Sequence, residues 1–68
     1  MPFELEADEQ RRLSNYKLIY EAGVLAHTSG EENPYNREED YKSFYTWLKG
    51  KQGDSWESVQ EHIIEHYL

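Results

Sequence analysis

The chain has 68 residues, with 14 Asp and Glu against 7 Lys and Arg, for a formal net charge of −7. This length allows one small domain and excludes a two-domain enzyme or a full nucleotide-binding fold. Cysteine is absent, which excludes disulfides and thiol chemistry and favours a cytoplasmic location. No apolar run is long enough to span a membrane, so we expect no membrane association. An aromatic content of 15% indicates a folded chain, because disordered segments are poor in aromatic residues.

The first segment, about residues 5–28, has the pattern of one long helix. Its apolar positions recur at steps of three and four residues: Leu13, Tyr16, Tyr20, Gly23/Val24 and His27. Gly23 in mid-helix is costly and predicts the close approach of another backbone or a large ring. Gly30 is expected to end the helix. We predict a frayed N-terminal arm over residues 1–7 and a single helical domain over residues 8–68.

A second helix is expected after a loop at residues 29–36. Asn36 and Glu39 have the spacing of a capping box at its start, and Gly50 is expected to end it. Its apolar stripe has helical spacing, with Trp47 on the flank: Tyr41, Phe44, Tyr45 and Leu48.

A third helix is expected to follow, with Asp54 as its N-cap. Its stripe repeats the helical spacing: Trp56, Val59, Ile63 and Tyr67. The sequence therefore predicts an all-α fold, a small three-helix domain. The first helix is long for such a small body, so part of its apolar face is available to a second copy of the chain, as in a homodimer.

One motif suggests chemistry. His62, Glu65 and His66 match H-x-x-E-H, in which two histidines on one helical face share a zinc ion and the glutamate acts as general base. Such enzymes need a third ligand and a cleft within a large scaffold, and only two residues follow His66. We therefore expect no catalytic residues, no metal site, no cofactor and no enzyme activity.

The acidic residues cluster, whereas the basic residues are scattered. This pattern opposes direct binding to nucleic acid, because phosphate binding depends on clustered Lys and Arg. It has two explanations: a surface that keeps a small protein soluble, or one that docks on the basic surface of a protein partner. On the second explanation the predicted partner-binding residues are Glu31, Glu32, Tyr35, Glu38, Glu39, Asp40 and Tyr41.

A resemblance to a known family adds a further expectation. The pattern consists of Tyr20, Gly23, Ala26, Gly30, Asn33-Pro34-Tyr35, Trp47, Leu48 and Gly50. It resembles the ribosome modulation factor family of small bacterial and phage proteins. The resemblance implies two helices joined by a Pro-Tyr loop, a bacterial or phage origin and binding to the ribosome. The ribosome-binding members are strongly basic, whereas this chain is acidic.

Two functions follow as predictions. The first is a small, acidic, non-catalytic regulator that binds a protein, such as a phage-encoded inhibitor or adaptor acting on a host protein. The alternative is a ribosome-associated factor of the hibernation type, as the resemblance implies.

Overall fold

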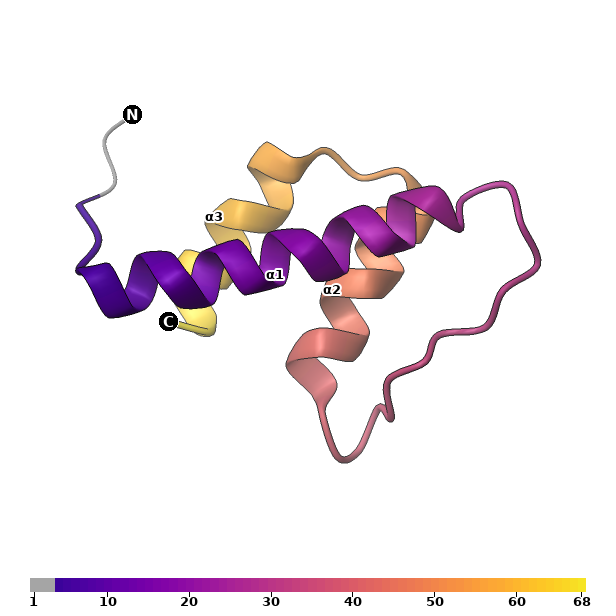
Figure 1. Cartoon of the computed structure of the whole chain (residues 1–68), viewed down its shortest axis with the longest axis horizontal. Helices are drawn as coiled ribbons and strands as arrows, with labels where there is room; N and C mark the ends of the chain where they lie inside the picture. The colour runs from indigo at the N-terminus through magenta and orange to yellow at the C-terminus, as the bar shows by residue number, and fades with distance from the viewer. Residues whose placement is uncertain (1–3) are drawn as a thin grey trace.

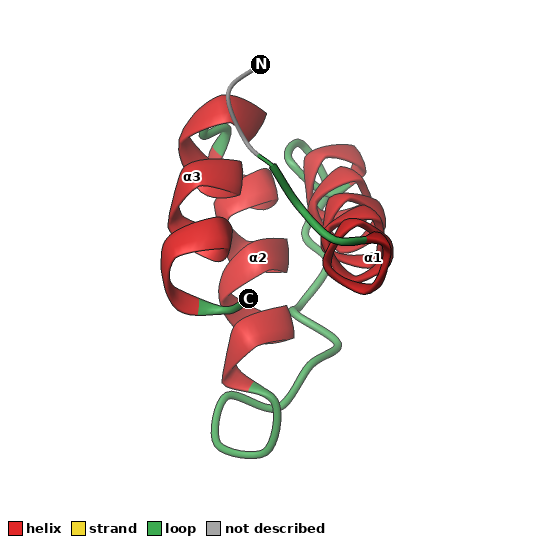
Figure 2. Cartoon of the chain, turned by 90° about the vertical axis from the view of Figure 1, so that its left-hand side faces the viewer, coloured by secondary structure: helices red, strands yellow, loops and turns green. Residues whose placement is uncertain are grey.

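The computed structural model describes residues 4–68 and contains three helices, α1 (Ala7–Leu25), α2 (Tyr41–Gln52) and α3 (Trp56–His66). The described residues form no strand, so the predicted all-α, three-helix fold is confirmed. The long helix α1 forms one layer, and α2 and α3 lie side by side in a second layer behind it (Figures 1 and 2).

Helix α1 begins at Ala7 with a capping box, in which the Glu6 N–H donates to the Glu9 carboxylate at 3.1 Å. Residues 1–3 of the predicted N-terminal arm lie outside the described residues. The helix ends at Leu25 and gives way to a turn over residues 26–28, so the expectation that it runs to Gly30 was wrong.

Lys51 of α2 binds the backbone just beyond this helix end. Its ammonium group donates to the carbonyl oxygens of Ala26 at 2.8 Å and Ser29 at 3.0 Å. The carbonyls at a helix end have no partner within the helix, and a cation is a favourable one there. Together with the N–H and hydroxyl of Ser29, which both donate to the Ala26 carbonyl at 3.2 Å, Lys51 supplies partners where the chain leaves α1.

The backbones of α1 and α2 touch where the two helices cross. A Cβ atom added to Gly23 would overlap the carbonyl oxygen of Trp47, and one added to Gly50 would overlap that of Tyr20. The close approach predicted at Gly23 is confirmed. The role predicted for Gly50 was wrong, because it lies inside α2, and the helix ends at Gly53 with a left-handed φ of 89°.

This crossing decides which face of α2 is buried. The buried residues are Ser43, Thr46, Trp47 and Gly50, and with Ala26, Val59 and Ile63 they form the centre of the fold. Small residues face α1 because larger ones would hold the two backbones apart. The predicted apolar stripe on α2 is therefore not the core face, and the large side chain buried on that face is Trp47, on the flank of the stripe.

Two helix caps differ from prediction by one to four residues. Helix α2 is capped by Asp40, whose carboxylate accepts from the Ser43 N–H at 3.3 Å, because Asn36 instead closes a separate turn before it. Helix α3 is capped by the Ser55 hydroxyl, while Asp54 pairs with Lys49 at 3.5 Å. In both cases the residue next to the helix takes the role predicted for an earlier one.

Candidate protein-binding surface

The face of α2 that turns away from α1 carries an open groove. Its volume is about 330 Å³, and it is lined by Arg37, Tyr41, Phe44, Tyr45 and Leu48. Tyr41 is 51% exposed, and the three other α2 residues are half-buried. The predicted apolar stripe is thus real, but it lines a surface groove. Aromatic groups that are partly exposed in this way are typical of protein-binding sites.

Helix α3 holds Tyr45 in place at one side of the groove. The Tyr45 ring lies 4.7 Å from the His62 ring, centre to centre, and packs edge-on against Tyr67 at 5.9 Å. The Lys49 ammonium group lies 5.2 Å from the centre of the Tyr45 ring. On its other side, the Tyr41 ring lies 6.2 Å from the Tyr45 ring, centre to centre. These contacts order the aromatic wall before any ligand arrives, which lowers the entropic cost of binding.

The packing beside the groove also shifts two pKa values. Burial raises the pKa of Tyr67 to about 12, assisted by the neighbouring tyrosines, and its hydroxyl has no hydrogen-bond partner among the described residues. The pKa of His62 is lowered, first by burial and then by the charge of His66. Both shifts favour the neutral form, so the aromatic wall beside the groove carries no charge from these two groups near neutral pH.

The acidic turn over residues 37–39 adjoins the groove through Arg37. Asn36 shapes this turn, since its side-chain oxygen accepts from the N–H groups of Glu38 at 2.8 Å and Glu39 at 3.0 Å. Both glutamate side chains are exposed. The predicted residue Asp40 is also exposed but caps α2. The turn therefore exposes two carboxylates in the residues that directly follow Arg37, which lines the groove.

Asn33 anchors the other predicted segment, residues 31–35. Its amide donates to the Phe44 carbonyl at 2.9 Å, and its oxygen accepts from the Tyr35 N–H at 3.0 Å. Tyr35 is consequently half-buried, while Glu31 and Glu32 are exposed. The anchor fixes the loop against α2 and leaves its acids in solvent.

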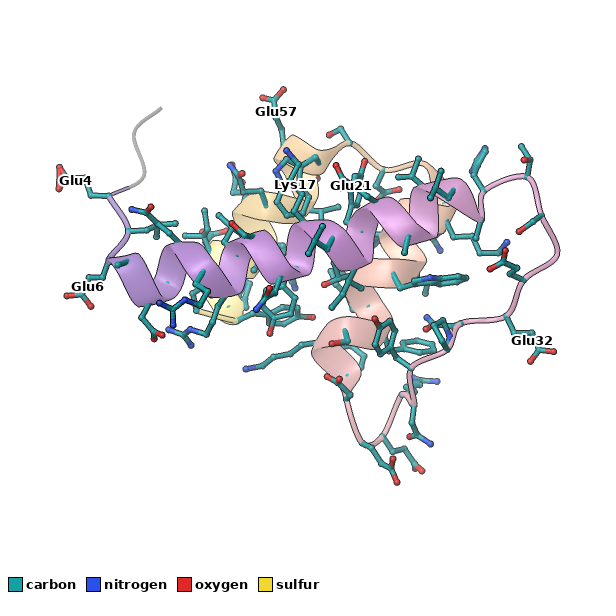
Figure 3. All side chains as sticks on the ribbon, viewed as in Figure 1. Glu4, Glu6, Lys17, Glu21, Glu32 and Glu57 are labelled. Carbon is teal, nitrogen blue, oxygen red and sulfur yellow. The ribbon has the colours of Figure 1, made fainter. Side chains whose placement is uncertain are left out.

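The structure divides the predicted binding residues into two places. Glu32 points outward from the long loop, away from the helices (Figure 3). The turn at residues 37–39 lies at the other end of that loop, at the start of α2 (Figure 1). Glu38, Glu39 and Tyr41 lie beside the groove, and Glu31 and Glu32 lie apart from them.

Of the five residues that line the groove, sequence reasoning assigned only Tyr41 to the binding site and missed the other four: Arg37, Phe44, Tyr45 and Leu48. Arg37 is one of several scattered basic residues and carries no signal of its own. Phe44, Tyr45 and Leu48 were assigned to the apolar stripe of the second helix and not to the binding site. Only the crossing of α1 and α2 shows that this stripe is open.

The histidines of the H-x-x-E-H motif lie in the aromatic cluster. The rings of His62 and His66 are 4.6 Å apart, and His62 also packs against Tyr67 at 5.2 Å. Among residues 4–68 no group of three or more His, Cys, Asp or Glu side chains is placed to hold a metal ion. The arrangement points to ring packing as the role of these histidines.

None of the helices in the described part of the chain is long and apolar enough to cross a membrane. Comparison with family models, with curated proteins and with solved structures finds no match to this chain. The resemblance to ribosome modulation factors therefore stays a prediction, and the surface is interpreted from its own geometry.

Proposed function

We propose that the chain is a non-catalytic regulator that binds a basic segment of another protein at the α2 groove. The observation that carries the proposal is an open groove lined by Arg37 and by four aromatic or aliphatic side chains of α2, with a turn beside it in the chain that exposes Glu38 and Glu39. Such a site suits a segment with one large apolar side chain next to Lys or Arg.

The two parts of the site have different roles in this proposal. The apolar side chain of the partner fills the groove against Tyr41 and Leu48 and supplies most of the affinity. The exposed carboxylates of Glu38 and Glu39 attract the basic neighbours, which raises the association rate and fixes orientation. Glu31 and Glu32, on the more distant part of the loop, contribute to long-range attraction.

An inhibitor or adaptor that acts in the cytoplasm is the form of regulator we favour. The net charge of −7 and the absence of cysteine support it. A phage-encoded protein acting on a host target would fit the same features.

Affinity capture from a bacterial lysate, with and without RNase, tests the proposal when site variants are compared. We expect a protein that survives RNase, is lost with Tyr41→Ala and is reduced by Glu38→Lys/Glu39→Lys. The matched control is Glu61→Lys/Glu65→Lys, which makes the same charge change on exposed positions of α3 and should leave capture unchanged.

Two other outcomes would reject the proposal. Ribosomal proteins that disappear with RNase would support the ribosome-associated alternative. A captured protein whose binding is the same for the wild type and every variant would show that the groove is not the binding site.

A further inference from the structure

The outer face of α1 is exposed and carries apolar side chains that no described part of the chain covers. Leu18 is 65% exposed and Leu25 is 84% exposed. In the view of Figure 2, α1 forms the right-hand side of the molecule, and α2 and α3 both lie to its left. This face points away from the backbone contact at Gly23, on the opposite side of the helix.

The residues on this face follow a heptad spacing. Most of α1 is exposed, and six of its exposed residues lie on this face at steps of four and three: Ala7, Arg11, Ser14, Leu18, Glu21 and Leu25. A repeat that averages 3.5 residues is the pattern by which two helices pair along a narrow seam. The face has this spacing, with Leu18 and Leu25 as its large apolar side chains and charged or small residues at the other four positions.

The charges on the face identify the occupant. If a second copy of α1 pairs with it in the antiparallel direction, Arg11 can face Glu21 of the other copy, and this ion pair occurs twice. In the same register Leu18 faces Ser14, and Leu25 faces Ala7. Every facing pair of residues in the seam then joins a large side chain to a small one or a positive charge to a negative one.

A parallel pair does not have this complementarity. It would place Arg11 against Arg11 and Glu21 against Glu21 of the second copy, which is unfavourable. The charge pattern thus selects the antiparallel arrangement.

The rest of α1 tolerates a second copy despite the acidity of the chain. Asp8, Glu9 and Glu21 are balanced by Arg11, Arg12 and Lys17, so the helix has no net charge. Lys17, which would meet its own copy at the edge of the seam, lies 5.9 Å from the centre of the Trp56 ring, on the side of α3 (Figure 3).

We propose that the outer face of α1 pairs with the same face of a second copy to form an antiparallel homodimer. The seam is only 19 residues long, which favours a weak and concentration-dependent dimer. The two ends at Leu25 then lie about 27 Å apart, since each residue adds about 1.5 Å to a helix.

This geometry has a consequence that rests on the proposed function, whereas the dimer itself does not. Each groove lies on the face of α2 that turns away from α1 (Figure 2), so the seam between the two α1 helices covers neither groove. Such a protein can hold two partner molecules at once, which favours an adaptor.

Sedimentation equilibrium of the 68-residue chain at low salt, from about 10 µM to about 1 mM, tests the dimer. We expect the average mass to rise toward that of a dimer in the wild type. Arg11→Glu alone and Glu21→Arg alone each place like charges together twice, and we expect each to weaken association at least about tenfold. An equimolar mixture of the two variants restores both ion pairs and should associate as well as the wild type.

The doubly exchanged chain, Arg11→Glu/Glu21→Arg, should also associate normally. Glu61→Arg makes on α3 the same charge change that Glu21→Arg makes on α1, and it serves as the matched control. A wild type that stays monomeric would overturn the proposal. So would folded single variants that associate like the wild type, or a mixture that fails to restore association. Circular dichroism of each variant separates lost pairing from lost folding, and none of these measurements depends on the groove having a partner.

Discussion

The two faces of α2 differ in a way that separates folding from binding. The face toward α1 is buried and contains mostly small residues: Ser43, Thr46, Trp47 and Gly50. The side chains of the opposite face are larger on average and remain partly exposed: Tyr41, Phe44, Tyr45 and Leu48. The fold thus depends on how closely two backbones approach at the first face. The rings of the second face remain available to a partner.

Gly50→Ala is expected to have the largest effect, because it inserts a methyl group into the backbone contact. The new Cβ would overlap the Tyr20 carbonyl, and a helix backbone cannot move aside as a flexible side chain can. We expect a loss of about 3 kcal/mol or more, out of a total of roughly 3–10 kcal/mol for a domain of this length. Thermal unfolding followed by circular dichroism measures it.

Gly30→Ala is the matched control for that change. No atom lies within 4 Å of a Cβ at Gly30, and its φ is not in the left-handed region. This variant should be as stable as the wild type or slightly more stable, because alanine reduces the entropy of the unfolded chain. Equal stabilities for Gly50→Ala and Gly30→Ala would contradict the direct contact of the two helices.

Truncation of one large ring on each face sharpens the comparison. Trp47 is 3% exposed, and Trp47→Ala should cost about 3–5 kcal/mol through lost burial and the cavity it leaves. Tyr41 is 51% exposed, and Tyr41→Ala should cost less than about 1 kcal/mol. Urea denaturation of both variants measures the difference. Similar losses of stability would mean that the groove face of α2 supports the fold as strongly as the face that packs against α1.

The sequence predicts the elements of this fold better than their contacts. Helical spacing was enough to find three helices, and the cost of glycine in mid-helix was enough to predict a close approach at Gly23. It was not enough to orient α2. Two of its faces have the same three-and-four spacing, and the more hydrophobic of the two is not the one that packs against α1. The deciding fact is the meeting of Gly23 with Gly50, two residues far apart in the chain.

The candidate site shows the same limit. The exposed acids Glu38 and Glu39 can be identified from the sequence, because charge clusters are local. The groove cannot, since it forms only after α1 has covered the other side of α2. The caps were uncertain for a related reason: Asn36 and Asp40 are both good capping residues, and the isolated turn between them decides which one begins the helix.

At neutral pH the smallest expected effect comes from Tyr67, which directly follows α3 and packs against Tyr45. Its buried hydroxyl lacks a partner among the described residues, and its pKa of about 12 exceeds the usual value of 10.0. The unfolded chain therefore loses this proton at lower pH than the folded chain. Stability should be unaffected by this group below about pH 10 and should fall as the pH rises from 10 to 12.

Tyr67→Phe tests this account by removing the hydroxyl while keeping the ring. It should raise stability by up to about 1 kcal/mol at neutral pH, because no unpaired polar group is then buried. It should also weaken the loss of stability between pH 10 and 12, while a part due to Tyr16 persists, since burial raises the pKa of Tyr16 as well. Absorbance titration of the phenols and urea denaturation across this range measure both effects, with Tyr41→Phe as the control on the exposed side. If Tyr67→Phe and Tyr41→Phe change the alkaline transition equally, the hydroxyl of Tyr67 is in contact with solvent, and the outer face is more open than the packing of its rings indicates.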